Sequence, residues 1–209
     1  MTSSSKDYFD GIGGNWDQMQ ERFFSDAVRE KAYAVANVQP GEVAADIGAG
    51  TGFVTEGLLS RGLSVVAVDQ SAPMLVALRE KFAQASVDCR VGTAEELPIQ
   101  AGSLDYVFAN MYLHHVEEPS DAIVEMVRTL KAGGKLVITD LDTHEYEFLR
   151  AEQHDRWMGF ERRDVERWFR DAGLTDVKVD CVGQSCCTTS DCGEDVAISI
   201  FVASGSLPA

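Results

Sequence analysis

The sequence predicts an α/β fold built on a doubly wound, mostly parallel sheet with helices on both faces. Apolar, strand-like runs alternate along the chain with segments of helical period, which is typical of such sheets. Several runs, such as "VVAV" and "KLVIT", are almost continuously apolar, as expected for strands that helices cover on both sides. The expected strands are Val43–Ile47, Ser64–Val68, Val87–Val91, Leu104–Ala109, Lys135–Asp140, Val177–Cys181 and Val196–Ala203.

The segments between these strands carry apolar stripes and the end signals of helices. Ser25, Ser71 and Ser120 stand where helix N-caps are expected, and Pro73 lies in the first turn of the second of these helices. The sequence "KAGG" is expected to end the third helix, and Gly173 to end a fourth. The stripes themselves predict core packing against the sheet.

Length and charge limit the class of protein. The 209 residues suit one domain with a substantial core. The 34 acidic and 18 basic residues give a net charge of −16, which disfavours nucleic acid and anionic membranes as partners. The N-terminus lacks the apolar core of a signal peptide, and no apolar run approaches the ~20 residues of a membrane span. We expect a cytoplasmic protein with reduced thiols and a small-molecule partner; the sequence gives no indication of oligomeric state.

An aromatic and acidic stretch, "DYFDGIGGNWDQMQERFF", precedes the first strand. We expect residues 1–38 to form an N-terminal helical segment and residues 39–205 to form the main domain. Tyr8 and Trp16 in this stretch fit a lid that closes over a site and touches substrate. The alternative is that both side chains simply pack against the sheet.

The sharpest local signal is "VAADIGAGTGF", in which a strand ends at Ile47 and a helix begins near Phe53. Gly48, Gly50 and Gly52 at such a turn let the backbone bend tightly and approach a ligand closely. The spacing is G-x-G-x-G, whereas dinucleotide sites have G-x-G-x-x-G. A carboxylate just before the first glycine, that of Asp46, favours a cationic ligand over a pyrophosphate.

Three further strand ends point to the same place. Asp69 follows the second strand, 21 residues after Gly48, close to the spacing at which an acidic residue binds ribose hydroxyls. The third strand leads into Thr93, Ala94 and Glu95, and the fourth into Asn110 and Met111. In open α/β sheets, ligands bind in the crevice at the carboxyl ends of the strands, so these residues predict one ligand site.

With these motifs, the stretch from Val43 to Ala203 resembles the class I S-adenosylmethionine-dependent methyltransferases, of the branch with small-molecule and quinone-precursor enzymes. The resemblance implies a Rossmann-like, seven-stranded sheet whose last strand, Val196–Ala203, is antiparallel. It implies S-adenosyl-L-methionine as methyl donor. The expected cofactor-binding residues are Asp46, Gly48, Ala49, Gly50, Asp69, Gln70, Met74, Thr93, Ala94, Glu95, Asn110 and Met111.

The resemblance also gives these residues roles. Asp46 and the Gly48–Gly52 loop hold the methionine part, and Asp69 takes the ribose hydroxyls. Gln70 and Met74 flank the adenine, the backbone of Ala94 contacts its edge, and Asn110 and Met111 lie near the sulfonium. Thr93 departs from the family, which often has an aspartate there, and Glu95 is the alternative contact to the exocyclic amine.

The expected function is methyl transfer from S-adenosylmethionine to a small molecule. The G-x-G-x-G spacing disfavours a nicotinamide oxidoreductase, whereas a non-catalytic S-adenosylmethionine-binding protein stays open. The absence of an "NPPY"-type tetrapeptide after the fourth strand ("NMYL" instead) argues against amide or exocyclic amine methylation. His115, after the fourth strand, and His144, after the fifth, are the candidate catalytic residues; a structural role is the alternative.

Four of the five cysteines crowd into "CVGQSCCTTSDC", residues 181–192. The stretch is expected to be a loop that leaves the sixth strand at the ligand edge of the sheet, where Cys186 and Cys187 would reach substrate. Its spacing does not fit a zinc site, and we assign no metal site. Two interpretations remain: a loop without a chemical role, or thiolates that hold trivalent arsenic in an arsenite methyltransferase.

Overall fold

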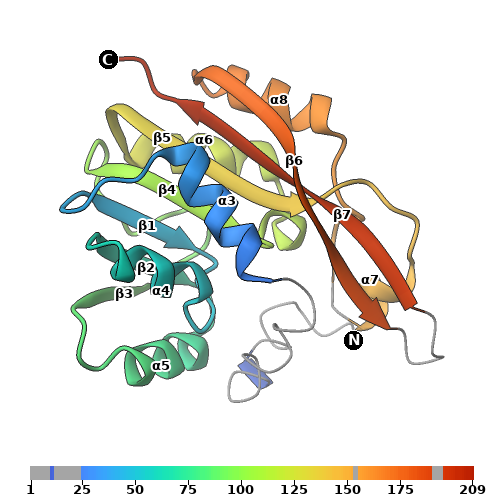
Figure 1. The fold of residues 1–209 in the computed structure, drawn as a ribbon, viewed down its shortest axis with the longest axis horizontal. Coiled ribbons are helices and arrows are strands. Elements are labelled where there is room, and N and C mark those ends of the chain that lie inside the picture. Colours follow the sequence, from blue (N-terminus) through green and yellow to red (C-terminus); the bar gives the residue numbers. More distant parts are fainter. Residues whose placement is uncertain (1–9, 12–24, 153–154, 190–194) are drawn as a thin grey trace.

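The computed structural model describes residues 10–11, 25–152, 155–189 and 195–209. These residues form a mixed α/β fold around a seven-stranded sheet of order β3-β2-β1-β4-β5-β7-β6 (Figure 1). Only β7 runs antiparallel to its neighbours β5 and β6, which confirms the predicted fold class and the antiparallel last strand. The strands are β1 (Val43–Ile47), β2 (Ser64–Asp69), β3 (Val87–Val91), β4 (Leu104–Asn110), β5 (Leu130–Leu141), β6 (Thr175–Thr189) and β7 (Asp195–Ser206).

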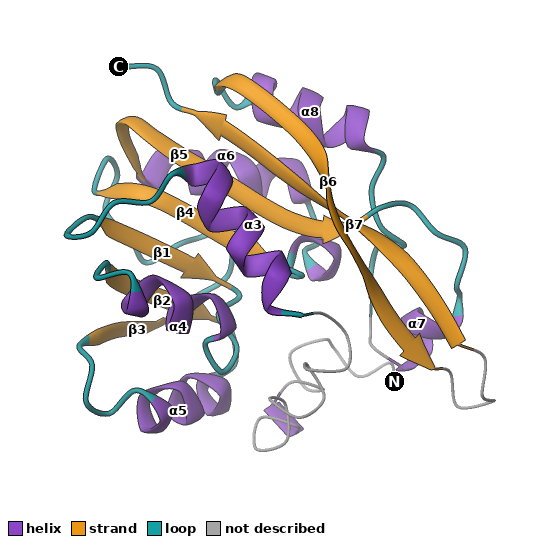
Figure 2. Ribbon diagram, in the orientation of Figure 1, coloured by secondary structure: helices purple, strands orange, loops and turns teal. Residues whose placement is uncertain are grey.

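Helices cover both faces of the sheet (Figure 2). One face packs against α6 (Pro119–Thr129) and α8 (Arg162–Asp171), and the other against α3 (Asp26–Ala36) and α4 (Phe53–Ser60). The remaining helices are α5 (Ala72–Lys81), the short α7 (Phe148–Glu152) and a 3-10 turn, η1 (Leu113–His115). α3 falls within the expected N-terminal segment, yet it packs on one face of the sheet. The expected boundary at residue 38 between that segment and the main domain stays a prediction.

The predicted strands agree with the structure most closely from β1 to β4. β1 and β3 have the predicted bounds, and β2 and β4 each extend one residue further. The end of the third predicted helix is wrong, because α6 ends at Thr129 and "KAGG" belongs to β5. A Cβ on Gly134 would lie only 2.9–3.2 Å from backbone oxygens of Lys131, Leu104 and Asp105, so the glycine serves close strand packing rather than a helix end. α6 also begins earlier than predicted, with Glu118 instead of Ser120 as its N-cap.

The cysteine-rich stretch is not the predicted loop as far as the structure describes it. β6 continues to Thr189 and pairs with β7 as a long antiparallel hairpin, in which Cys186 faces Ile198 across the ladder. The pairing register shifts between Cys181 and Ser185, around Gly183 with φ +81°. This stretch carries no strand signal, because its small polar residues do not alternate with large apolar ones.

The far half of this hairpin has its own small apolar cluster. Cys186 is buried there with Val28, Leu141, Leu149, Ile198 and Ile200, and Phe53 and Met111 pack against the cluster. A buried thiol in such surroundings acts as a small hydrophobic side chain. Cys186 is therefore a side chain of the core and not an exposed thiol.

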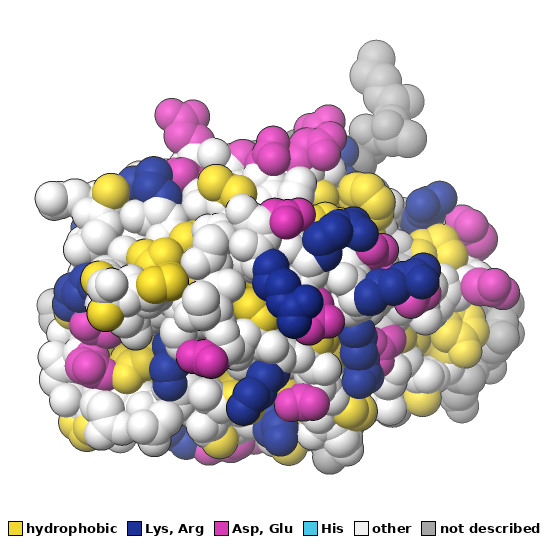
Figure 3. All heavy atoms as spheres, turned by 90° about the horizontal axis from the view of Figure 1, so that it is seen from above, with side chains coloured by type: hydrophobic (Ala, Val, Ile, Leu, Met, Phe, Trp, Pro, Cys, Tyr) yellow, Lys and Arg dark blue, Asp and Glu magenta, His cyan; other side chains and the backbone are white. Residues whose placement is uncertain are grey.

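Charged residues of both signs share the face seen in Figure 3, where basic side chains lie beside acidic ones. Helix α8 shows how they pair: Arg162 with Asp142 at 2.6 Å, and Arg170 with Glu166 at 2.6 Å. Exposed pairs of this kind add little to stability, but they keep the arginines of an acidic chain locally neutralised. Among the described helices, none combines the length and apolar character needed to cross a membrane.

Cysteine-to-serine exchanges on β6 test the corrected view of this stretch. We expect Cys186→Ser to lower the free energy of unfolding by about 1–3 kcal/mol, because it buries a hydroxyl in an apolar cluster. Cys181→Ser, at an exposed position of the same strand, should change it by less than about 0.5 kcal/mol. Urea denaturation followed by circular dichroism measures both, and equal effects would contradict the burial of Cys186.

Candidate active site

The glycine turn after β1 forms the floor of the site. Gly48, Gly50 and Gly52 have φ values of +69°, +53° and +95°, a region that favours glycine. The backbone N–H groups of Gly48 and Ala49 donate to the carbonyl oxygen of Val68 at 2.9 and 3.1 Å, which ties the turn to β2. A Cβ on Gly48 would lie 2.2 Å from the ring of Tyr112, so only glycine fits beneath that ring.

Asp46, the last but one residue of β1, is a buried carboxylate at the edge of this turn, with 2% of its surface exposed. Its Oδ2 accepts hydrogen bonds from the backbone N–H of Thr55 at 2.9 Å and from the Thr55 hydroxyl at 2.7 Å. Burial raises the pKa of Asp46 to about 7, although the bonds from Thr55 oppose the shift, and the nearby Asp69 adds to it. A positive charge brought into the pocket would favour the ionised carboxylate.

Asp69, the last residue of β2, joins the two halves of the site. Its Oδ2 accepts from the backbone N–H of Gly50 at 2.8 Å, and its Oδ1 accepts from that of Ser71 at 2.8 Å. Burial raises the pKa of Asp69 despite these bonds. One carboxylate thus fixes both the glycine turn and the start of α5, whose N-cap Ser71 accepts from the backbone N–H of Met74 as the sequence predicts.

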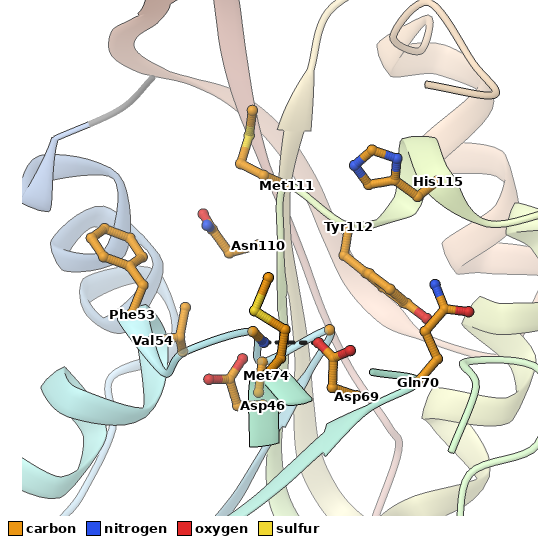
Figure 4. Close-up of a pocket in the computed structure, with 13 residues that line it drawn as sticks. Asp46, Phe53, Val54, Asp69, Gln70, Met74, Asn110, Met111, Tyr112 and His115 are labelled. Carbon is orange, nitrogen blue, oxygen red and sulfur yellow. Dashed lines mark hydrogen bonds between the residues drawn. The ribbon is translucent and has the colours of Figure 1, made fainter. Parts of the chain in front are cut away.

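A pocket opens at the carboxyl ends of β1, β2 and β4 (Figure 4). Nine of the twelve expected cofactor residues line it, together with the candidate catalytic His115. Phe53 and His115 lie on opposite sides of it, with Met111 and Asn110 between them (Figure 4). The lining residues are Asp46, Gly48, Ala49, Gly50, Phe53, Val54, Asp69, Gln70, Met74, Asn110, Met111, Tyr112 and His115.

The three expected residues after β3 do not line this pocket in the described structure. Ala94 is fully buried in the main core, while Thr93 and Glu95 are exposed and Thr93 pairs with Glu96 in an isolated bridge. Tyr112 lies between them and the glycine turn, and its hydroxyl is hydrogen-bonded to the backbone of Ala94. Burial, with the charges of Asp69 and Glu95, raises the pKa of Tyr112. Tyr112 therefore occupies the backbone contact of Ala94 that the family resemblance assigns to adenine.

The histidines fall into two groups relative to the pocket. His115 lines it, whereas His144 is buried and is not among the described lining residues. Nδ1 of His144 accepts from the backbone N–H of Tyr146 at 3.3 Å, and its ring stacks on that of Tyr146. Burial lowers the pKa of His144, and the neighbouring His114 adds to this shift.

His114 is the centre of a buried polar group next to His115. Its Nδ1 lies 2.7 Å from Oδ1 of Asp140, at the end of β5, and its Nε2 lies 3.6 Å from Oδ1 of Asp155. Burial alone would lower the pKa of His114, but the two carboxylates raise it to about 9. The rings of His114 and His115 have centroids 4.1 Å apart.

The expected substrate residues are not assembled around the pocket. Tyr8 and Trp16 lie outside the described residues, so the lid stays a prediction. Cys186 is one of the buried residues of the hairpin cluster and is not among the pocket's lining residues. Cys187 belongs to β6, and its side chain is not described.

Sequence reasoning missed five residues of the site. Phe53 and Val54 open the helix after the glycine turn, and Tyr112 follows Met111, so their place beside recognised motifs was the available signal. Asp140 and Asp155 had weaker signals. Asp140 ends a predicted strand at the ligand edge, but Asp155 comes near the site only through the fold, because it lies 40 residues beyond His115 in the sequence.

Comparisons with known proteins agree with this geometry. Residues 45–138 match the methyltransferase domain family. An uncharacterized methyltransferase of Mycobacterium tuberculosis is 45% identical over 91 residues, which are 44% of this chain and 36% of that protein. A demethylmenaquinone methyltransferase of Renibacterium salmoninarum is 39% identical over 101 residues, 48% of this chain and 42% of that protein.

A solved structure extends the likeness to the whole fold. The Haemonchus contortus phosphoethanolamine N-methyltransferase 2, in complex with S-adenosyl-L-methionine, matches with a TM-score of 0.78 at 18% identity, over 100% of this chain and 61% of that one. The matched segments span only 36% and 42% of the two sequence relatives' own lengths. The matched residues contain the strand ends and the glycine turn that form the pocket, and this part of the chain is a methyltransferase domain of the class I, S-adenosylmethionine-dependent kind.

Proposed function

We propose that this chain transfers the methyl group of S-adenosylmethionine to a small organic acceptor, bound between Phe53, Met111 and His115. When bound, the cofactor supplies a methyl group on a positively charged sulfur that is already activated for displacement. The main task of the protein is then to align the acceptor and to exclude water from the pocket.

The observation that carries this proposal is the pairing of two buried carboxylates, Asp46 and Asp69, with a left-handed glycine turn. Among the lining residues of the described pocket there is no lysine or arginine. A pyrophosphate would therefore meet two carboxylates without a counterion, whereas a ligand with a sulfonium and an ammonium group would neutralise them. The charge of the site supports a cationic nucleoside and opposes a dinucleotide.

Each part of the pocket has one proposed task. The Gly48–Gly52 turn leaves room for the methionine part, with Asp46 beside its positive charges. Asp69, already oriented by Gly50 and Ser71, accepts hydrogen bonds from the ribose hydroxyls. Gln70 and Met74 flank the adenine, and Asn110 and Met111 lie near the sulfonium.

The adenine edge and the ring of Tyr112 compete for one contact. The backbone of Ala94, which the family resemblance assigns to adenine, already bonds to the hydroxyl of Tyr112. We therefore expect Tyr112 to stay in place as a wall of the adenine subsite or to turn aside when the cofactor binds. Thr93 and Glu95, the proposed contacts to the exocyclic amine, do not line the pocket.

The acceptor side of the pocket favours a flat, partly apolar molecule. Phe53 and Met111 offer apolar surface, and His115 opposite them offers a polar contact to an acceptor hydroxyl. A relative named as a demethylmenaquinone methyltransferase acts, by that name, on a quinone-type ring. We propose a hydroxylated aromatic acceptor of this kind, with His115 in contact with it and His144 behind the wall.

The arsenite interpretation has lost its main support. It required several exposed thiols on a loop, whereas the described part of the stretch is a strand and Cys186 is buried. A buried thiol in an apolar cluster is a poor source of thiolate. A non-catalytic cofactor-binding role differs from our proposal only in turnover, and turnover is what the first experiment measures.

The proposed function is tested with radiolabelled S-adenosylmethionine and a panel of phenols, naphthoquinols, small thiols and arsenite. We expect labelled product from an aromatic hydroxyl compound, and equal product from wild type and Cys186→Ser, because that thiol does not face the pocket. Cofactor binding without turnover of any acceptor would favour the non-catalytic role. Methylation of arsenite alone, lost in Cys186→Ser, would overturn the choice of acceptor.

Replacing Asp69 tests the cofactor subsite. We expect Asp69→Asn to weaken S-adenosylmethionine binding by about 2 kcal/mol, roughly 30-fold, because an amide cannot accept from ribose and from two backbone N–H groups together. Asp88→Asn on β3 removes the same charge from an exposed side chain and should leave the affinity unchanged. Calorimetric titration compares the three proteins, and equal affinities would contradict the assignment.

The raised pKa of Asp46 predicts a pH dependence of cofactor affinity. The free carboxyl, with a pKa of about 7, is partly protonated at neutral pH, and a cationic ligand binds best to its ionised form. Affinity should therefore fall as the pH drops below 7, by at most about tenfold per pH unit, with proton release on binding. Asp46→Asn should bind more weakly and lose this slope, so that only the ligand's own titration remains. The same slope in both proteins would show that another group is responsible.

A further inference from the structure

A compact group of buried side chains lies behind the pocket wall that His115 forms. Three of them, His114, His115 and Asp155, each offer one ligand-type atom, and these atoms all lie within 4.8 Å of one another. The side chains of His114 and Asp155 are 6% and 3% exposed, and that of His115 is 9% exposed. We refer to these three residues as the histidine–aspartate cluster.

The spacing inside the cluster is unusual for direct hydrogen bonding. Oδ1 of Asp155 lies 3.6 Å from Nε2 of His114 and 3.8 Å from Nδ1 of His115. Both distances exceed the ~2.7–3.2 Å of an N–H···O hydrogen bond. Donor atoms that surround a tetrahedral zinc ion at ~2.0–2.1 Å lie roughly 3.3–3.4 Å apart. The two nitrogen–oxygen distances are slightly longer than this spacing, so a small shift of Asp155 toward the histidines would bring its oxygen to metal-binding geometry with each nitrogen.

The surroundings of His114 match those of a metal-binding histidine. Its Nδ1 is held by Oδ1 of Asp140 at 2.7 Å, which leaves Nε2 as the atom that faces Asp155. Metal-ligating histidines commonly bond their second ring nitrogen to a carboxylate, which fixes the orientation of the ring. Oδ1 of Asp140 also accepts from the backbone N–H of Leu141 at 2.7 Å, so the supporting carboxylate is itself held in place.

The backbone brings the distant Asp155 to this point independently of any ion. The N–H groups of Arg156 and Trp157 both donate to the carbonyl oxygen of His114, at 3.0 and 3.1 Å. The indole N–H of Trp157 donates to the carbonyl oxygen of Val116 at 2.9 Å. The segment that carries Asp155 is thus bound to both ends of the histidine pair, and the cluster is preorganised.

We propose that His114, His115 and Asp155 form a binding site for a divalent transition metal of the zinc type. Two imidazole nitrogens and one carboxylate oxygen are donors that such ions favour, and catalytic zinc sites commonly have three protein ligands and one open position. A divalent cation would displace the proton on Nε2 of His114 and balance the two buried carboxylates, Asp140 and Asp155. The site goes beyond the proposed methyl transfer and does not depend on it.

The place of the site gives it a consequence for the pocket. His115 belongs both to the cluster and to the lining of the pocket. A metal ion bound through Nδ1 of His115 would fix that ring and determine which of its atoms is offered to an acceptor. The ion would thereby position a residue of the acceptor wall opposite Phe53 (Figure 4).

The test is metal binding by the full chain without an affinity tag, in a background where Cys181, Cys187 and Cys192 are serine so that these three thiols do not compete. Protein stripped with a chelator is titrated with Zn²⁺ by calorimetry and with Co²⁺ by absorption spectroscopy. We expect one ion per chain and a Co²⁺ spectrum of nitrogen and oxygen ligands, without the charge-transfer band of a thiolate. Asp155→Asn should lower the Zn²⁺ affinity at least tenfold.

Two comparisons keep the result decisive. Glu117→Gln removes an exposed carboxylate two residues beyond His115 and should bind Zn²⁺ as tightly as the parent protein. Unchanged circular dichroism of Asp155→Asn shows that the variant folds. The proposal is overturned if the parent binds no stoichiometric ion, if Asp155→Asn binds as tightly, or if Co²⁺ shows thiolate ligation. No cofactor or acceptor is present, so the outcome is independent of methyl transfer.

Discussion

The hydrogen bond from the backbone N–H of Gly50 to Asp69 is the interaction on which the pocket depends. It joins the turn after β1 to the end of β2, so two neighbouring parallel strands present their ends as one surface. The same carboxylate holds the start of α5 through Ser71. A turn of three left-handed glycines has few side-chain contacts of its own, and this bond, with those of Gly48 and Ala49 to Val68, gives it a single shape.

The fold and the cofactor side of the pocket were predictable because their signals are local. β1 is mostly apolar and buried, and its bounds were predicted to the residue. The bounds of β3 were predicted equally well, although it is an edge strand of half-buried and exposed residues. Residues that follow parallel strands meet at one edge, and this rule alone brought Asp46, Asp69 and Asn110 to one pocket. Thr93 and Glu95 also follow a parallel strand, but they are exposed and do not line the pocket, and the hydroxyl of Tyr112 bonds to the backbone of Ala94 between them.

The proposed acceptor side was not predictable, because it depends on contacts between distant segments. Asp155 lies near His114 because the next two residues donate backbone hydrogen bonds to the carbonyl oxygen of His114, and no periodicity in the sequence predicts these bonds. The extension of β6 in its hairpin with β7 was not predictable either, because "GQSCCTT" has neither the alternation nor the large side chains of a typical strand. This stretch is a strand because it pairs with β7, where the apolar Ile198 and Val196 are its partners. Gly134 looked like a helix terminus, whereas its real role is close approach to the backbone of β4.

The shift of register at Gly183 divides the hairpin into two halves with different neighbours. On β6, the half before the shift, up to Cys181, continues the main sheet. The half after it, from Ser185 onward, packs on the cluster that contains Cys186 and Leu149. Phe53 and Met111 pack against that same cluster and also line the pocket. Sequence change in the outer hairpin can therefore reshape the acceptor wall while Asp46 and Asp69 stay as they are, so a lineage of such enzymes could acquire new substrates without rebuilding its cofactor site.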